Sequence, residues 1–135
     1  MDIPALLREN GLRATPGRIQ LLQVLSKERL PLPVDRIKEK LEEKLDTVTV
    51  YRTLEALRLA GLVERTDLQH GHAHYELMHG RPHHHHAVCR TCGLIEDIEV
   101  PHAKNPAKDA ERSARKFSSI DSYALEFFGT CTRCA

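Results

Sequence analysis

The chain of 135 residues is predicted to be an α+β protein. An N-terminal winged helix-turn-helix domain is expected to precede a small C-terminal α/β domain. Two observations predict this order. The first half carries apolar residues at helical spacing followed by two short strand-like segments, whereas the second half carries all four cysteines as two CxxC pairs. The expected domains are residues 1–78 and 87–135, joined by a hinge at residues 79–86.

Three helices are expected in residues 1–45. Residues 3–10 form a short helix that ends at Gly11, because glycine readily adopts the left-handed conformation found just past a helix end. Thr15 caps the next helix, whose first turn holds Pro16. Residues 34–45 form a third, amphipathic helix, since apolar side chains recur in it at intervals of four, at Ile37, Leu41 and Leu45.

A fourth helix is expected to begin after a cap at Asp46 or Thr47 and to end near Gly61. Its apolar face consists of Val50, Leu54 and Leu57. At about 100° per residue, Arg52 points away from that face and is flanked by Thr49 and Tyr51. These side chains suit base edges and phosphate oxygens in a major groove.

A solvated helix surface is the alternative to DNA binding for such a helix. The segment that follows the helix favours DNA binding, because two expected strands at residues 62–65 and 74–77 flank a turn that contains Gly71. Helices followed by such a hairpin occur in the order of a winged helix. The net charge of only +1 does not by itself predict a nucleic-acid partner.

Composition excludes several other classes of protein. Hydrophobic residues make up 41% of the chain and charged residues 29%, which is typical of a soluble globular protein. Aromatic residues are only 4%, with no Trp, so a stacking platform for single-stranded nucleic acid is not expected. No apolar run approaches the roughly 18 residues of a membrane span, and the N-terminus does not resemble a signal peptide. We therefore expect a cytoplasmic protein that has no membrane partner.

The cysteines predict a structural metal site. Cys89 and Cys92 form one CxxC pair, and Cys131 and Cys134 form the other. Four thiolates provide a closed tetrahedral site for Zn²⁺, which is favoured over the alternatives of a redox pair or chance spacing. The segments between them are expected to form a strand at 92–100, a helix at 107–117 and a strand at 120–128. Zinc would then pin the C-terminus to the start of this domain.

The run HGRPHHHH at residues 79–86 predicts a second kind of metal site. A purification tag is disfavoured because the run is internal and short. If the segment is extended, His84 and His86 share one face and His83 and His85 the other. On the preceding strand the same alternation aligns His72, His74 and Glu76. A mixed imidazole and carboxylate site built from both segments would suit Fe²⁺, Zn²⁺, Mn²⁺, Co²⁺ or Ni²⁺. Any one of these histidines taken alone is expected to be a solvated surface residue.

Together these stretches closely resemble the ferric uptake regulator superfamily over nearly the whole chain. The matching stretches are GLRATPGR, TVYRTLEALRLAGLVER, HHHHAVCRTCG and FFGTCTRC. The resemblance implies a homodimeric repressor that binds a palindromic double-stranded DNA operator when a regulatory divalent metal occupies the hinge. It also implies that the C-terminal domain mediates dimerisation.

The resemblance also assigns individual residues. Tyr51 and Arg52 match contacts of the recognition helix, and Arg18 matches a basic residue near the DNA backbone. The four cysteines match structural zinc ligands. The ligands Glu76, His84 and His86 match the regulatory site.

The sequence departs from the family pattern at two metal sites. It has LPLP at residues 30–33 where relatives often carry a further hinge histidine. His72, His74 or His79 could replace that ligand, and Glu64 is a weaker candidate. An additional site of the family would use His83 and His85, but the late histidine position is Tyr123 here and the acidic region reads PHAKN.

Several functional alternatives stay open at this level. The sensed metal is Fe²⁺ or Zn²⁺, with Mn²⁺ possible, and a peroxide-sensing regulator of the same superfamily is a second reading. A zinc enzyme is less favoured because no HExxH or HxE with PCxxC motif occurs. A metal-storage or chaperone protein would have no use for a recognition helix. We therefore expect no catalytic activity and no small-molecule substrate.

Overall fold

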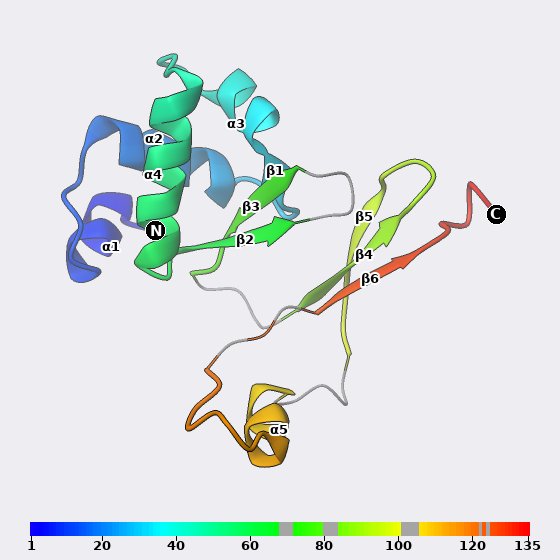
Figure 1. Ribbon diagram of the computed structural model, residues 1–135. Helices are drawn as coiled ribbons and strands as arrows, with labels where there is room; N and C mark the ends of the chain where they lie inside the picture. Colours follow the sequence, from blue (N-terminus) through cyan, green and yellow to red (C-terminus); the bar gives the residue numbers. More distant parts are fainter. Residues whose placement is uncertain (68–71, 80–83, 101–105, 122, 124) are drawn as a thin grey trace. The chain divides into compact units, whose positions relative to one another are not determined.

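The computed structural model describes residues 1–67, 72–79, 84–100, 106–121, 123 and 125–135 (Figure 1). The chain divides into two compact units, Met1–Pro82 and His83–Ala135. The expected hinge spans this division, and its residues 80–83 lie outside the described residues, as does the turn residue Gly71. The domain boundaries at 78 and 87 therefore stay predictions.

The first unit contains helices and a small sheet in the expected order. Its elements are α1 (Ile3–Glu9), α2 (Pro16–Ser26), β1 (Leu32–Pro33), α3 (Val34–Lys40), α4 (Thr47–Leu59), β2 (Val63–Asp67) and β3 (Ala73–Leu77). The sheet is antiparallel and has the strand order β1-β3-β2. The α+β class is confirmed, and β1 is an addition that the sequence did not predict.

Side-chain caps position the helices of this unit. The Thr15 hydroxyl accepts a hydrogen bond from the Arg18 N–H at 3.4 Å and begins α2, as expected. Of the two candidate caps for α4, Asp46 is the one used, and its carboxylate accepts from the Thr49 N–H at 2.8 Å. These bonds satisfy backbone donors that have no partner within the first helical turn.

The third helix is shorter than predicted. It ends at Lys40 rather than at Leu45. Leu41 turns to an extended conformation with a ψ of 130° and remains buried. The Gln20 side chain stabilises the segment that follows. Its amide donates to the Glu43 carbonyl at 3.1 Å and accepts from the Glu43 N–H at 3.3 Å. Apolar spacing of four therefore placed Leu41 correctly in the core and Leu45 against it, but it predicted a helix where the segment is irregular.

A continuous apolar core fixes the first unit. All four helices of this unit contribute fully buried side chains, and α4 buries the predicted face made by Val50, Leu54 and Leu57. Tyr75 from β3 is also fully buried in this core. The opposite side of α4 is thereby left exposed.

The second unit has a smaller fold. Its elements are β4 (His85–Cys89), β5 (Ile95–Ile98), α5 (Pro106–Ser113) and β6 (Glu126–Gly129). The sheet has the order β5-β4-β6, with β4 antiparallel to β5 and parallel to β6. All three predicted elements between the cysteine pairs are present, but each is shorter than its predicted range of 92–100, 107–117 or 120–128.

Local contacts explain the shortening. Cys92 lies in a turn rather than a strand, because Gly93 has a φ of 79° and its N–H donates to the Cys89 carbonyl at 2.9 Å. After α5 the chain is irregular, and the Glu111 carboxylate accepts the Ile120 N–H at 2.9 Å. No helix among the described residues is long and apolar enough to cross a membrane.

Candidate metal centre and nucleic-acid interface

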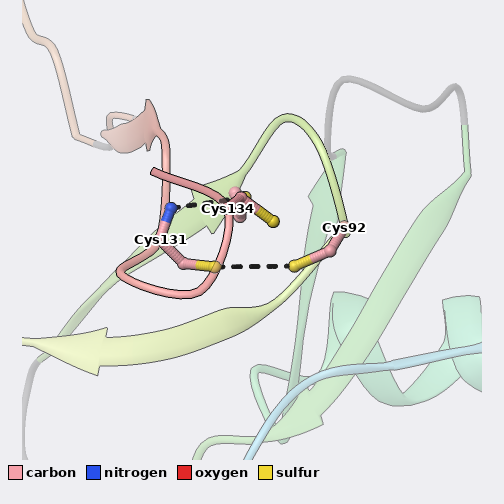
Figure 2. Close-up of side chains that lie close together, drawn as sticks. Cys92, Cys131 and Cys134 are labelled. Atoms are coloured by element: carbon pink, nitrogen blue, oxygen red, sulfur yellow. Dashed lines mark hydrogen bonds between the residues drawn. The ribbon is translucent and has the colours of Figure 1, made fainter.

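The sheet of the second unit brings the two CxxC pairs together. Cys89 ends β4 and lies opposite Gly129 of the parallel strand β6, so the second pair follows directly beside the first. The sulfur atoms of the four cysteines all lie within 4.8 Å of one another. Figure 2 shows Cys92 and Cys131 facing each other, with their sulfur atoms 3.7 Å apart.

The local hydrogen bonds distribute charge unevenly over this cluster. The Cys131 N–H donates to the Cys89 sulfur at 3.4 Å, and with further backbone donors it lowers the pKa of Cys89 to about 6. Hydrogen bonds with the sulfurs of Cys131 and Cys92 raise the pKa of Cys134 to about 12. The thiolate form of Cys89 is therefore favoured at neutral pH. Four thiolates so close together would need a bound cation to balance their negative charges. This donor set fits a closed, tetrahedral Zn²⁺ ion.

Two predicted regulatory ligands lie together at the other end of β4. His86 is buried on the strand and His84 immediately precedes it. Their ring centroids are 5.0 Å apart, with the ring planes nearly perpendicular. Extended backbone thus places alternate histidines on one side, as the sequence predicted.

Asp97 is a neighbour of this pair that the sequence reasoning missed. It lies opposite His86 in the β4–β5 register, and its carboxylate oxygen is 3.5 Å from His86 Nε2. A carboxylate in this position can orient the imidazole ring by a hydrogen bond, or it can bind the same metal ion as the imidazole. The sequence did contain a signal for this contact. The acidic segment IEDIEV follows the CxxCG turn, so a hairpin would pair it with the strand that carries the histidines.

His85 has different surroundings from those of His84 and His86. Its buried ring lies 6.4 Å from Tyr123 and 6.3 Å from Phe127, measured between ring centroids. His83 and the PHAKN segment at 101–105 lie outside the described residues. Among the residues that the structure describes, His85 belongs to no group of three metal-type ligands. The rings of Tyr123 and Phe127 therefore lie next to His85, one of the two histidines that the additional site would use.

Glu76 is the predicted regulatory ligand of the first unit. It lies on β3, opposite Glu64 of β2, and is only 1% exposed, whereas Glu64 is exposed. A carboxylate so thoroughly buried requires compensating charge or hydrogen bonds. Glu76 is therefore the chemically stronger of these two candidates.

Two of the remaining hinge candidates, His72 and His74, lie beside α4. His72 and His74 line a groove of about 310 Å³ together with Tyr51 and Asp35. His74 Nδ1 is 3.0 Å from the His72 carbonyl oxygen. His79 is exposed at the end of the described part of this unit.

The exposed side of α4 carries the predicted DNA-reading residues. Thr49 and Arg52 are exposed, and Tyr51 is 43% exposed. Arg18, on α2, is half-buried and donates to the Arg13 carbonyl at 3.0 Å. The helix presents a cation and hydroxyl groups outward, as a major-groove element requires.

Ion pairs connect α4 to the wing strand β2. Glu55 lies 2.7 Å from Arg58 and 3.7 Å from Arg65, which also pairs with Asp67 at 3.2 Å. Each of these groups is substantially exposed, so individual pairs contribute little to stability.

Comparison with known proteins agrees with this arrangement. Residues 9–128 match the ferric uptake regulator family. The ferric uptake regulation protein of Legionella pneumophila is 36% identical over 140 residues, covering 99% of each chain. The peroxide operon regulator of Bacillus subtilis (strain 168) is 31% identical and covers 96% of this chain and 88% of its own.

A solved structure supports the same relationship. The ferric uptake regulator from Pseudomonas aeruginosa, determined with manganese, superposes with a TM-score of 0.76 at 27% identity. The match covers 98% of this chain and 99% of that one.

Proposed function

The chain belongs to the ferric uptake regulator family of metal-responsive, DNA-binding transcription repressors, and we propose that it represses genes of metal homeostasis. In this proposal a homodimer binds a palindromic operator when a divalent ion occupies the regulatory site. The observation that carries it is the combination, in one chain, of an outward-facing recognition helix and a four-sulfur cluster.

The proposed DNA contacts come from the exposed side of α4. Arg52 would contact guanine edges or phosphate, and Tyr51 and Thr49 would contact phosphate oxygens or thymine. Arg18 would contact the backbone from α2. Two recognition helices in a dimer would lie roughly 34 Å apart, or a multiple of that distance, along the major groove.

The proposed metal sites have separate roles. Cys89, Cys92, Cys131 and Cys134 would hold structural Zn²⁺. The regulatory ion, Fe²⁺ or Zn²⁺ with Mn²⁺ as a further candidate, would take Glu76, His84 and His86. Asp97 and one of His72, His74 and His79 are candidates to complete that set. Ligands contributed by both units would make the arrangement of the DNA-binding units depend on the metal.

The supporting chemistry is a linkage between metal and DNA. A bound metal ion supplies positive charge that favours one domain arrangement over others. Coupling between two sites is typically about 1–3 kcal/mol, so the metal should change DNA affinity by about fivefold to a hundredfold. We further propose a cytoplasmic location, no small-molecule substrate and no catalytic activity.

A peroxide-sensing regulator is the second candidate, favoured by the similarity to the Bacillus subtilis peroxide operon regulator. Iron-catalysed oxidation of a ligand histidine would then release DNA. Mass spectrometry after peroxide treatment of the Fe²⁺-loaded protein distinguishes the two functions. Oxygen addition to His84 or His86, accompanied by loss of DNA binding, would favour the peroxide sensor.

The main test measures fluorescence anisotropy of duplexes selected by the protein from a random pool. Protein that retains zinc but lacks labile metal is titrated anaerobically with Fe²⁺, Zn²⁺ and Mn²⁺ in separate experiments. Tighter binding with one ion supports the proposal and identifies the sensed metal. Failure to enrich any duplex, with every ion, would refute it.

Variants of the β4 histidines test the ligand assignment. His84→Ala and His86→Ala should abolish the response of DNA binding to metal while retaining zinc and the fold. His85→Gln is the matched control on the same strand, because its ring faces Tyr123 and Phe127, and it should retain the response. The reverse pattern would show that the regulatory ligands lie on the other face.

A further inference from the structure

An exposed valine lies on the recognition helix at a position that the proposed contacts do not use. Val48 is the second residue of α4 and is 56% exposed. A β-branched residue is a poorer helix former than alanine, and this side chain is not part of the apolar core. Neither helix formation nor core packing therefore explains a valine here.

Helical geometry aligns Val48 with the proposed base-contacting residue. Val48 and Arg52 are four residues apart, so they lie one above the other on the same side of the helix. Val50 and Leu54 lie on the buried side. The valine methyl groups therefore extend the exposed surface of Arg52 toward the N-terminal end of α4.

The N-terminal end is the part of a recognition helix that approaches base edges. In the major groove, an apolar side chain discriminates thymine through its C5-methyl group. The polar side chains of Asp46 and Thr47, at this end of α4, already have hydrogen-bond partners within the protein. Asp46 accepts the Thr49 N–H, and Thr47 accepts a hydrogen bond from the Lys38 ammonium at 2.7 Å.

We propose that Val48 is a specificity-determining residue that contacts the C5-methyl group of a thymine in each operator half-site. Four helical residues span about 6 Å, close to the rise of two base pairs. The thymine is therefore expected within a few base pairs of the contact of Arg52. The inference rests on the proposed DNA-binding function and adds a base preference to it.

Thymine-to-deoxyuridine scanning tests this contact, because the replacement removes only the C5-methyl group. Duplexes selected by the wild-type protein are substituted one thymine at a time in one half-site. Binding is measured for the wild type, Val48→Ala and Leu59→Ala. Leu59 is a matched control, since it is 78% exposed on the same helix but at its C-terminal end.

At one thymine the wild-type protein should lose about fourfold in affinity, the value expected for one buried methyl group. Because Val48→Ala changes both subunits of the dimer, it should bind the unmodified duplex about as weakly as the wild type binds a duplex modified at this thymine in both half-sites. The same replacement should then cost this variant little more. Leu59→Ala should keep the wild-type pattern, and thermal unfolding should show that both variants remain folded.

The outcomes separate this inference from the proposed function. Enrichment of a duplex whose scan is identical for wild type and Val48→Ala would overturn the contact but leave the regulator intact. Equal weakening of Val48→Ala on every duplex, without coupling to any thymine, would also overturn it. Failure to select any duplex would overturn both.

Discussion

The two units are stabilised by different means. The first buries a continuous set of aliphatic side chains drawn from α1, α2, α3, α4 and its sheet. In the described part of the second unit, the buried side chains are Val88, Cys89, Ala107, His85 and His86. Few of these are aliphatic, so hydrophobic burial alone provides little stability there. A region with few buried aliphatic residues but a four-sulfur cluster is expected to depend on metal for its fold.

The two units should also differ in which substitutions destabilise them most. Binding of structural zinc can contribute on the order of 10 kcal/mol, comparable to the whole stability of a small domain. One ligand in the second unit should therefore matter more than any one core residue in the first. The following predictions test this order, beginning with the largest expected effect.

Replacing a cysteine should unfold the second unit. Cys131→Ser removes a sulfur that lies 3.7 Å from Cys92, and we expect loss of zinc, of this unit's fold and of the dimer. Zinc content, sedimentation velocity and amide hydrogen exchange would measure these effects. Thr132→Ser, an exposed neighbour in the same turn, is the control and should change none of them. A Cys131→Ser protein that keeps its zinc and its exchange protection would contradict the metal-dependent fold.

Removing part of the aliphatic core should destabilise the first unit alone. Leu54 is fully buried in α4, so Leu54→Ala should lower the free energy of unfolding by about 2–5 kcal/mol. Thermal unfolding monitored by circular dichroism would detect this loss, while zinc content should not change. Leu59→Ala shortens an exposed leucine of the same helix and should be nearly neutral. Loss of zinc from Leu54→Ala would show that the two units do not unfold separately.

The smallest expected effect concerns the cap of α4. Hydrogen bonding to Thr49 is the main cause that lowers the pKa of Asp46 below its ordinary value of 3.8, and the charges of Arg52 and Lys38 act in the same direction. Because the folded-state pKa is depressed, the stabilisation is present above pH 3.8 and is lost as pH falls through the folded-state value.

Asp46→Asn retains a capping oxygen but removes this charge. The variant should be slightly less stable than the wild type at neutral pH and should show a shallower loss of stability below about pH 4. Thermal unfolding across pH 2–7 measures this difference. Identical acid profiles for the two proteins would show that the carboxylate charge at this cap does not contribute.

Local sequence patterns were sufficient to predict much of the fold. Thr15 and Pro16 predicted the start of α2, and the spacing of Val50, Leu54 and Leu57 predicted the buried face of α4. These signals succeed because capping and helical periodicity act over a few residues. Where a pattern had two physical solutions, as at Leu41 and Leu45, the helical one was wrong. Contacts with another helix, such as the hydrogen bonds between Gln20 and Glu43, stabilise the irregular segment instead.

The metal centres show the same division. Sequence by itself determined that two CxxC pairs and a histidine run supply metal-type ligands, since the chemistry resides in the residue types. Tertiary structure decided that Cys89 and Cys131 meet, because β6 pairs in parallel with β4. It likewise placed Asp97 beside His86 through the pairing of β5 with β4. The register between β4 and β6, which are distant in the chain, depends on packing and hydrogen bonds that no local pattern encodes.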